Sequence, residues 1–455
     1  MKTTTETQNK MGVAPVLPLI IKMSLPAMFA MLVQSMYNIV DSIFVSRLGE
    51  KALTAVTLSF PVQILMIAIG VGTGIGLNSV VSRRLGERRH EDASRAATHA
   101  VYLGFLNFLV FALLGIFFVE PFVSIFTEDE YIFANTVSYL KIITVFSIGI
   151  FLQINFEKTL QATGNMIYPM IFQMSGALIN IILDPIMIFG LFGFPKMGVA
   201  GAGAATVIGQ TVALIFSTYV ILTKEHEVHI SLKSYRFDRK TAKEIYAVGI
   251  PSIVMQSIGA LLITGLNSIL ISFSEAAVSV MGVYFRLQSF VFMPVFGLNQ
   301  GLMPILGYNY GAKNRDRMMQ ALKYGIMIAL GIMLSGTVVF FLFPAKLMGI
   351  FHATDEMLAI GVPALRIISL HFGLAAVGIV ISALFQAVGI GKYSLYISAI
   401  RQMVVILPLA YLFSRLLPFR YIWYSFPIAE VVSIMFSFYF LKRLYDTKIR
   451  FLSVE

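Results

Sequence analysis

The chain has 455 residues, of which 58% are hydrophobic and only 13% are charged, and its mean hydropathy is +0.83. Soluble domains carry about 25% charged residues, so this composition excludes an ordinary soluble protein and predicts one that crosses a membrane many times. The chain has no cysteine, which excludes disulfides, thiol catalysis and thiolate metal sites.

Twelve apolar stretches follow one another along the chain. Each is long enough to cross the hydrocarbon core of a bilayer, which needs about 20 residues of helix. They lie near residues 22–46, 53–81, 96–119, 132–156, 167–191, 198–222, 245–271, 277–306, 318–343, 357–387, 393–414 and 421–441. The polar N-terminal segment lacks an apolar core followed by a cleavage site, so no cleaved signal peptide is expected. The sequence therefore predicts an all-α membrane protein with twelve spanning helices.

Basic residues are unevenly distributed between the connecting segments. If the N-terminus is inside, the cytoplasmic segments contain 21 Lys and Arg, whereas the opposite segments contain six. This excess predicts by the positive-inside rule that both termini are cytoplasmic. It also accounts for the net charge of +11, so nucleic-acid binding is not expected.

The first predicted helix carries a carboxylate, Asp41, within an almost wholly apolar stretch. An ionisable side chain at that depth costs about 2.5 to 3.5 kcal/mol, so by default it indicates a functional site. Helical spacing places three further polar side chains on the same stripe, and we treat them as candidate cleft residues: Gln34, Tyr37 and Asn38. Pro26 should bend this helix and make it a moving part. The alternative is that Asp41 is a buried, hydrogen-bonded packing residue.

The fifth predicted helix carries a second intramembrane acid. Asn180 and Asp184 are four residues apart and share a helix face, and Pro185 frees a backbone carbonyl that can bind a cation or a side chain. If Asp184 approaches Asp41, repulsion between the two carboxylates favours a shared proton or a bound cation.

Glu157 lies where the fourth predicted helix meets the cytoplasm, with Gln153 and Gln161 one turn on either side. This arrangement suits an inner gate, with Gln153 and Glu157 as its candidate residues. The alternative is that Glu157 is an interfacial charge beside Lys158, with both side chains reaching for water.

The two halves of the chain repeat each other. A polar and basic linker, residues 223–244, separates an N-terminal lobe, residues 1–222, from a C-terminal lobe, residues 245–455. One constant offset along the sequence, which we call the repeat offset, aligns Pro26 with Pro251, Gln63 with Gln288, Gly72 and Gly76 with Gly297 and Gly301, and Gln161-Ala162 with Gln386-Ala387. Six helices per half predict that the repeats insert in the same sense. We expect the paired glycines to let helix backbones approach closely.

The second half carries Arg286, Arg366 and Arg401 within or near predicted helices. We treat Arg286 as a candidate cleft residue that could bind an anionic group. The alternative is that these arginines satisfy backbone carbonyls or a neighbour such as Glu430. His371 is most simply explained as a helix-packing residue.

The sequence gives no indication of an enzyme. His226 and His229 have no third ligand nearby, so a metal site formed by them is not expected. No hydrolase motif and no phosphate-binding loop is present. We therefore expect no catalytic residues, no cofactor and no direct use of ATP.

Several of these segments together resemble the multidrug and toxic compound extrusion (MATE) family of antiporters. The segments are Pro26, NIVDSIFVSRLG at 38–49, QATGN at 161–165, ILDPIMIFG at 182–190 and GLNQGLMPILGYNYGAKN at 297–314. The acids confined to the first half are similar to those of the DinF-like or MepA-like bacterial branch. The resemblance implies twelve helices in two parallel six-helix bundles around a V-shaped cleft. It also implies a coupling site at Asp41, Asn180 and Asp184.

The resemblance further implies a secondary antiporter that exports amphiphilic organic cations in exchange for H⁺ or Na⁺ bound at the coupling site. The 24 Met and 38 Phe residues can supply an adaptable apolar wall for such substrates. The alternative function is a flippase for lipid-linked saccharides, which would need a broadly cationic cleft. The expected partners are small cationic substrates and the lipid bilayer, with the chain acting as a monomer in the cytoplasmic (inner) membrane.

Overall fold

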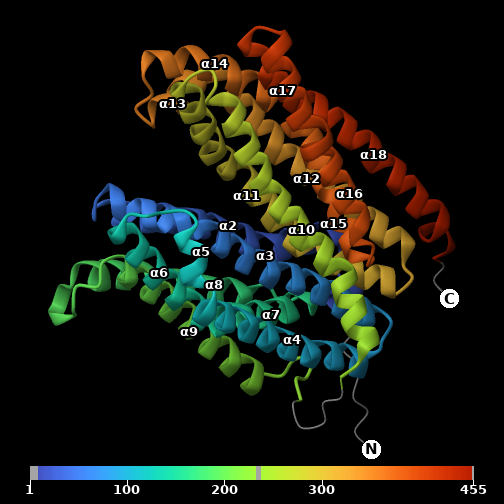
Figure 1. The fold of residues 1–455 in the computed structure, drawn as a ribbon. Helices are drawn as coiled ribbons and strands as arrows, with labels where there is room; N and C mark the ends of the chain where they lie inside the picture. Colours follow the sequence, from blue (N-terminus) through green and yellow to red (C-terminus); the bar gives the residue numbers. More distant parts are fainter. Residues whose placement is uncertain (1–8, 232–236, 453–455) are drawn as a thin grey trace, which may run out of the picture. The chain divides into compact units, whose positions relative to one another are not determined.

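The computed structural model describes residues 9–231 and 237–452, and the side chain of Asn38 lies outside the described set. Within these ranges the regular secondary structure is entirely helical (Figure 1). Ten helices of the described residues are long and apolar enough to cross a membrane, and counting each of two bent helix pairs as one span gives twelve. The predicted all-α class and the predicted spans are therefore confirmed.

Each half of the chain contributes a similar succession of helices. The first half contains α1 (Lys10–Val13), α2 (Val16–Ser46), α3 (Glu50–Gly86), α4 (His90–Phe117), α5 (Val119–Ser124), α6 (Glu130–Val145), α7 (Ile148–Ala162), α8 (Ile167–Phe189), η1 (Leu191–Gly193) and α9 (Val199–Thr223). The second half contains α10 (Arg239–Leu270), α11 (Glu275–Gly311), α12 (Arg315–Leu342), α13 (Pro344–Gly349), α14 (Asp355–Ser369), α15 (Phe372–Ala387), α16 (Gly391–Ala399), η2 (Ile400–Ile406), α17 (Leu407–Leu416), η3 (Phe419–Tyr424), α18 (Ser425–Thr447) and η4 (Ile449–Phe451).

The bounds of these helices follow the repeat offset found in the sequence. Helix α3 spans residues 50–86 and α11 spans residues 275–311, so the repeat offset relates them at both ends. Helices α4 and α12, at residues 90–117 and 315–342, are related in the same way. The internal repeat predicted from the sequence is therefore present in the local structure.

The fourth and tenth spans are bent, whereas the sequence predicted continuous helices there. Helices α6 and α7 meet at 44°, and α14 and α15 meet at 49°. Neither break contains proline. Instead, the N–H of Ser147 bonds to the carbonyl of Thr144, and the N–H of His371 bonds to the carbonyl of Ile368, each three residues back. These tight 3₁₀-type turns interrupt the α-helical ladder, and hydropathy alone does not reveal them.

The chain divides into two compact units whose borders cross two spanning helices. We call residues 29–85 with 89–253 the N unit, and residues up to 28 with 86–88 and 254–455 the C unit. Helix α2 belongs to the C unit up to Met28, two residues beyond Pro26, and to the N unit after it. Helix α10 belongs to the N unit up to Ile253, two residues beyond Pro251, and to the C unit after it. The two predicted lobes follow the sequence repeat. The compact units differ from these lobes, because the opening turns of α2 belong to the C unit and those of α10 belong to the N unit. Within the predicted linker, residues 232–236 lie outside the described residues.

Glycines allow the exchanged segments to pack backbone against backbone. In the N unit, a Cβ on Gly76 of α3 would overlap the carbonyl of Ile245 in α10. In the C unit, a Cβ on Gly301 of α11 would lie 2.5 Å from the hydroxyl oxygen of Ser24 in α2. The glycine one turn earlier on each helix makes an equivalent approach. The predicted close approach is confirmed, and we call these contacts of α3 with α10 and of α11 with α2 the glycine seams.

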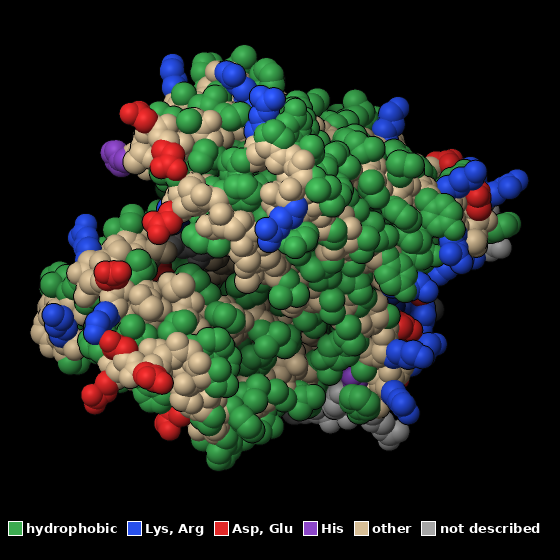
Figure 2. Space-filling view, turned by 45° about the horizontal axis from the view of Figure 1, so that its top comes forward, with side chains coloured by type: hydrophobic (Ala, Val, Ile, Leu, Met, Phe, Trp, Pro, Cys, Tyr) green, Lys and Arg blue, Asp and Glu red, His purple; other side chains and the backbone are tan. Residues whose placement is uncertain are grey.

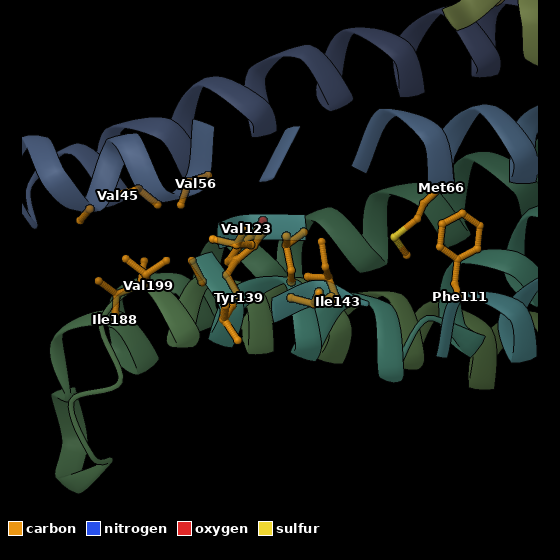
Figure 3. Packing of buried hydrophobic residues seen from close by; sticks show 14 of the residues in the cluster. Val45, Val56, Met66, Phe111, Val123, Tyr139, Ile143, Ile188 and Val199 are labelled. Atoms are coloured by element: carbon orange, nitrogen blue, oxygen red, sulfur yellow. The ribbon is translucent and has the colours of Figure 1, made fainter. Parts of the chain in front are cut away.

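The apolar core of the N unit gathers side chains from several helices (Figure 3). Val45 of α2, Val56 of α3 and Val199 of α9 belong to one buried cluster with Tyr139 and Ile143 of α6. This packing fixes the relative positions of helices within the N unit. Tyr139 also borders the polar site described below.

The outward faces of the helices are strongly apolar. Figure 2 shows hydrophobic side chains over most of the visible surface, with Lys and Arg at scattered places, many of them along its rim. On α9, Ile215, Tyr219 and Leu222 are 63%, 60% and 72% exposed. Apolar faces of this extent suit contact with lipid and not with water.

Asp238 caps the N-terminus of α10. Its carboxylate accepts hydrogen bonds from the backbone N–H groups of Lys240 and Thr241, at 2.9 and 3.2 Å, and from the Thr241 hydroxyl. The side-chain hydrogen bond from Thr241 is the main reason that the pKa of Asp238 lies below its usual value. A lowered pKa in the folded state means that the carboxylate stabilises the protein above its unfolded pKa, and that this stabilisation disappears as the pH falls through the folded pKa.

We expect Asp238→Ala to lower the free energy of unfolding by about 1 kcal/mol, because the helix loses its cap. The difference from the wild type should shrink as the pH falls below the ordinary aspartate pKa of about 4, and it should be lost once the pH has fallen through the lowered pKa of the folded-state carboxylate. Thermal unfolding in detergent across pH measures both effects. Asp316→Ala is the matched control, because Asp316 lies in the first turn of α12 while Asn314 caps that helix. Equal losses in the two variants would contradict the capping role.

Candidate functional site

Two spanning helices of the N unit bring the intramembrane acids together. Helix α2 carries Asp41, α8 carries the fully buried Asp184, and the two carboxyl groups lie close enough to interact directly. An ionised carboxylate only accepts hydrogen bonds, so a hydrogen bond between the two groups would form only when one of them carries a proton. The acids of the first and fifth spans therefore form one site, which can hold a shared proton.

The site extends from α8 to α9 through an amide and a hydroxyl. With its Nδ2 turned toward Asp184, Asn180 donates to Asp184 Oδ2 at 3.0 Å. Asn180 Oδ1 then accepts from the backbone N–H and the hydroxyl of Thr206, at 2.9 and 3.2 Å. The two helices can approach closely because Gly209 has no side chain, and a Cβ there would lie 2.6 Å from the carbonyl oxygen of Gly176.

Two tyrosines border the acid pair. Tyr37 lies one turn before Asp41 on α2, and its hydroxyl is a hydrogen-bond partner of Thr206. Tyr139 of α6 accepts a hydrogen bond from Gln63 Nε2 of α3 at 3.0 Å and is electrostatically coupled to Asp41. Side chains from α2, α3, α6, α8 and α9 thus surround the acids.

The acid pair has no basic partner among the described residues. The Oδ1 atoms of Asp41 and Asp184 are both buried, and neither has a hydrogen-bond partner in the described part of the chain. An unpaired buried charge is costly, so the arrangement favours binding of H⁺ or a small cation. Carboxylate, amide and hydroxyl oxygens are also ligands that hard cations prefer. The described residues contain no group of three His, Cys, Asp or Glu side chains placed to bind a metal ion.

A second buried polar cluster surrounds Glu157 on α7. Its carboxylate accepts hydrogen bonds from the amides of Gln153, Gln161 and Gln173, at 3.1, 2.9 and 2.8 Å. Lys158 Nζ lies 3.3 Å from Glu157 Oε1, and the two side chains are only 8% and 4% exposed. Snorkelling would keep the charged groups in water, so that alternative for Glu157 is wrong. Sequence analysis identified Gln153 and Glu157 but did not place Gln173 with them.

The remaining candidate residues have different environments. Gln34 is half-buried on α2, and the prediction for the Asn38 side chain lies outside the described residues. Arg286 is exposed on α11 and belongs to the C unit. Pro26 lies within α2, close to the unit border. His371 contacts aromatic rings at the break between α14 and α15, in agreement with a packing role.

Sequence analysis missed three residues that contribute to the acid site: Gln63, Tyr139 and Thr206. Gln63 and Tyr139 come from helices whose own polar patterns do not point to Asp41. Thr206 was detectable, because it is the only polar side chain between residues 199 and 209, a stretch otherwise made of Gly, Ala, Val and Ile. A lone hydroxyl in such a helix indicates a contact between helices or with a ligand.

Comparison with protein families gives two matches within the chain. The MatE family model matches residues 26–186 and again residues 251–412. The two matches begin at positions that the repeat offset pairs, Pro26 and Pro251, and together they cover most of the chain. This agreement confirms the internal duplication.

Known proteins resemble the chain over almost its whole length. The multidrug export protein MepA of Staphylococcus saprophyticus subsp. saprophyticus is 27% identical and aligns over 90% of both chains. An FAD transporter of Shewanella oneidensis is 26% identical over 95% of both chains. A solved structure described as the outward-facing conformation of a multidrug resistance MATE family transporter of the MOP superfamily is 27% identical, with a TM-score of 0.91 over 98% of this chain and 99% of that one. These relatives are named as transporters and not as enzymes, and the chain belongs to the MatE family as a multi-pass membrane transporter.

Proposed function

We propose that the protein is a secondary active exporter that expels amphiphilic organic cations in exchange for H⁺ or Na⁺. The exchange would take place at Asp41, Asn180 and Asp184. The observation that carries this proposal is the contact between the half-buried Asp41 and the fully buried Asp184, which have no basic partner among the described residues. The relatives named as multidrug export proteins support drug-like molecules as substrates.

The energetics of exchange favour a site with two acids. Exporting a monocation against an inside-negative potential costs about 2.3 kcal/mol per 100 mV, and one incoming H⁺ or Na⁺ regains the same amount. One-for-one exchange is therefore electrically silent and driven by the chemical gradient alone. Two carboxylates can accept a second positive charge, which would add the membrane voltage as a driving force. We favour H⁺, because a proton shared between Asp41 and Asp184 would remove the repulsion between the two carboxylates.

Helix α2 is suited to transmit ion binding to the rest of the protein. Its opening turns pack on α11 through Gly301, whereas the part that carries Asp41 packs in the N unit. Pro26 lacks an N–H and weakens the helix just before this change of unit. We propose that neutralising the acid pair lets α2 bend at Pro26, which contracts the substrate site.

The remaining parts of the proposal concern the gate and the membrane. The buried hydrogen-bonded cluster around Glu157 would act as an inner gate near the cytoplasmic end of α7. The excess of Lys and Arg in one set of connecting segments supports cytoplasmic N- and C-termini in a bacterial inner membrane. We propose that a monomer is the transporting form.

A flippase for lipid-linked saccharides remains less well supported. It would need a broadly cationic cleft, but Arg366 donates to the carbonyl of Phe341 and lies over its ring. Arg401 pairs with Glu430. Both arginines are therefore already bound to other groups of the protein.

A vesicle assay tests the proposed function. Everted membrane vesicles containing the protein should accumulate a lipophilic dye cation when a proton or sodium gradient is imposed. Collapse of that gradient by an ionophore should stop the accumulation. Dye movement that is the same with and without the protein, under both gradients, would contradict the proposal.

Replacing Thr206 should weaken coupling without removing an acid. Thr206→Val keeps the shape of the side chain but removes the hydroxyl that joins Asn180 to Tyr37. A hydrogen bond is worth about 1 kcal/mol, so we expect the apparent affinity for the coupling ion to fall by about fivefold. Initial transport rates measured against ion concentration give this affinity. Thr211→Val is the control, because the Thr211 hydroxyl bonds to the Val207 carbonyl of its own helix. Equal effects in both variants would rule out a specific role for Thr206.

A further inference from the structure

The C unit contains an ion pair between a buried acid and a half-buried arginine that the proposed transport site does not use. Glu430 of α18 is 3% exposed, and its Oε2 lies 3.5 Å from Arg401 Nη1. Arg401 is the second residue of η2, a π-helical segment between α16 and α17. Short π-helical segments within α-helices occur frequently at functional sites. The pair therefore differs from an incidental surface contact.

Several polar atoms around Glu430 have unused hydrogen-bonding capacity. Glu430 Oε1, Tyr284 Oη and Ser433 Oγ are buried without a partner among the described residues. Tyr284 is electrostatically coupled to both Glu430 and Arg401, and Ser433 lies one turn from Glu430 on α18. On α15, Gly378 presents no side chain, and a Cβ there would lie 3.6 Å from Oε1. A carboxylate and two hydroxyls form an oxygen-rich donor set of the type that binds a proton or a hard cation.

The repeat places this pair on the helices that correspond to those of the acid site. By the repeat offset, Glu430 corresponds to Ala205, which precedes Thr206 on α9. Arg401 corresponds to Gly176, one turn before Asn180 on α8. The charged group that faces Glu430 from the elements packed against it is Arg401, and the titratable but neutral group is Tyr284. Beyond them lies His371, whose ring stacks on Phe426 of α18.

We propose that Glu430, Tyr284 and Ser433 form a second cation site, whose occupant is the tethered guanidinium of Arg401 in place of a free H⁺ or Na⁺. Among the described residues, the acid pair of the N unit has no basic partner, whereas Glu430 of the C unit is paired with Arg401. If the proposed function is correct, it follows that the coupling stoichiometry is set by the N unit alone. The site itself does not depend on that function.

Removal of the guanidinium should open the site to a free ion. The parent protein for this test carries Asp41→Asn and Asp184→Asn, so that ions bound by the N-unit acids do not contribute. Into this parent we introduce Arg401→Met, and separately Arg401→Met with Glu430→Gln. The purified proteins are titrated with acid in weakly buffered detergent solution, and Na⁺ binding is measured with the radioactive ion.

The expected result is that Arg401→Met binds one more H⁺ or Na⁺ per molecule than the parent. Its melting temperature should rise on acidification or on addition of Na⁺, and fluorescence of the single tryptophan, the buried Trp423, should follow the same titration. Adding Glu430→Gln should return all three readouts to the parent values. Arg366→Met is the control, and it should change none of them.

Two outcomes would overturn the proposal. The first is a folded Arg401→Met protein with no additional ion uptake. The second is additional uptake that persists after Glu430→Gln. If Arg401→Met does not fold, recovery of folding by Glu430→Gln or by added H⁺ or Na⁺ supports the proposal, and failure of all three to restore folding contradicts it. Because the assay measures equilibrium binding without transport, its failure is distinct from a failure of the proposed exchange function.

Discussion

Replacing either acid of the N-unit pair is expected to abolish gradient-driven export. Asp41→Asn and Asp184→Asn each keep the shape of the side chain but remove a group that can exchange a proton or bind a cation. Couplings between ligands typically change affinities by up to about 150-fold, so we expect the gradient-dependent rate to fall on the order of 100-fold. Dye accumulation by energised everted vesicles measures this rate.

The control for this experiment is an acid outside the site. Asp316→Asn changes an exposed residue at the start of α12, whose carboxylate pairs with Arg315 of the same helix. Gel filtration and thermal unfolding establish that each variant inserts and folds. If Asp41→Asn or Asp184→Asn pumps at the normal rate with normal ion dependence, that residue is not a coupling carboxylate. The alternative of a buried packing residue then applies to it.

Filling the glycine seams is expected to prevent correct folding. A leucine at Gly76 would push into the backbone of α10, and a leucine at Gly301 would push into α2. Overpacking of a well-packed core costs about 1 to 3 kcal/mol, and overlap with backbone leaves little room to relax, so we expect a loss of about 3 kcal/mol or more in each variant. The amount of protein recovered as a symmetrical gel-filtration peak, and its melting temperature, measure the loss.

The matched control for the seams is Gly282→Leu on α11. A Cβ on Gly282 would meet nothing within 4 Å, and leucine is a better helix former than glycine. We therefore expect normal yield and stability for this variant. Normal yield and melting temperature in Gly76→Leu and Gly301→Leu would show that the seams are not required for folding.

The sequence predicted the spanning helices well, because each must be apolar along its whole length. It also singled out Asp41 and Asp184, because ionisable residues are costly inside a bilayer. The breaks at Ser147 and His371 were not predicted, because they contain no proline and depend on a local change in hydrogen bonding.

Contacts between helices were only partly predictable. The spacing of Asn180 and Asp184 showed that they share a face, but it did not show that Thr206 would complete their hydrogen bonds. That contact depends on how closely α8 and α9 pack. Likewise, Pro26 and the glycine pairs were visible, but the exchange of opening turns between units follows from tertiary packing. Local sequence patterns therefore identify candidate functional and packing residues, but they do not always predict which residues of other helices these contact.

The exchange at the acid pair is tested most directly by counting the ions released when a dye cation binds to the purified protein. By linkage, an ion that weakens substrate binding is itself bound more weakly, by the same factor, when substrate is present. In weakly buffered detergent solution with a pH indicator, or with sodium preloaded, the wild type should release H⁺ or Na⁺ in proportion to the dye bound. The double variant Asp41→Asn with Asp184→Asn should release neither. Dye binding to the wild type without release of either ion, or equal release by the double variant, would contradict the account.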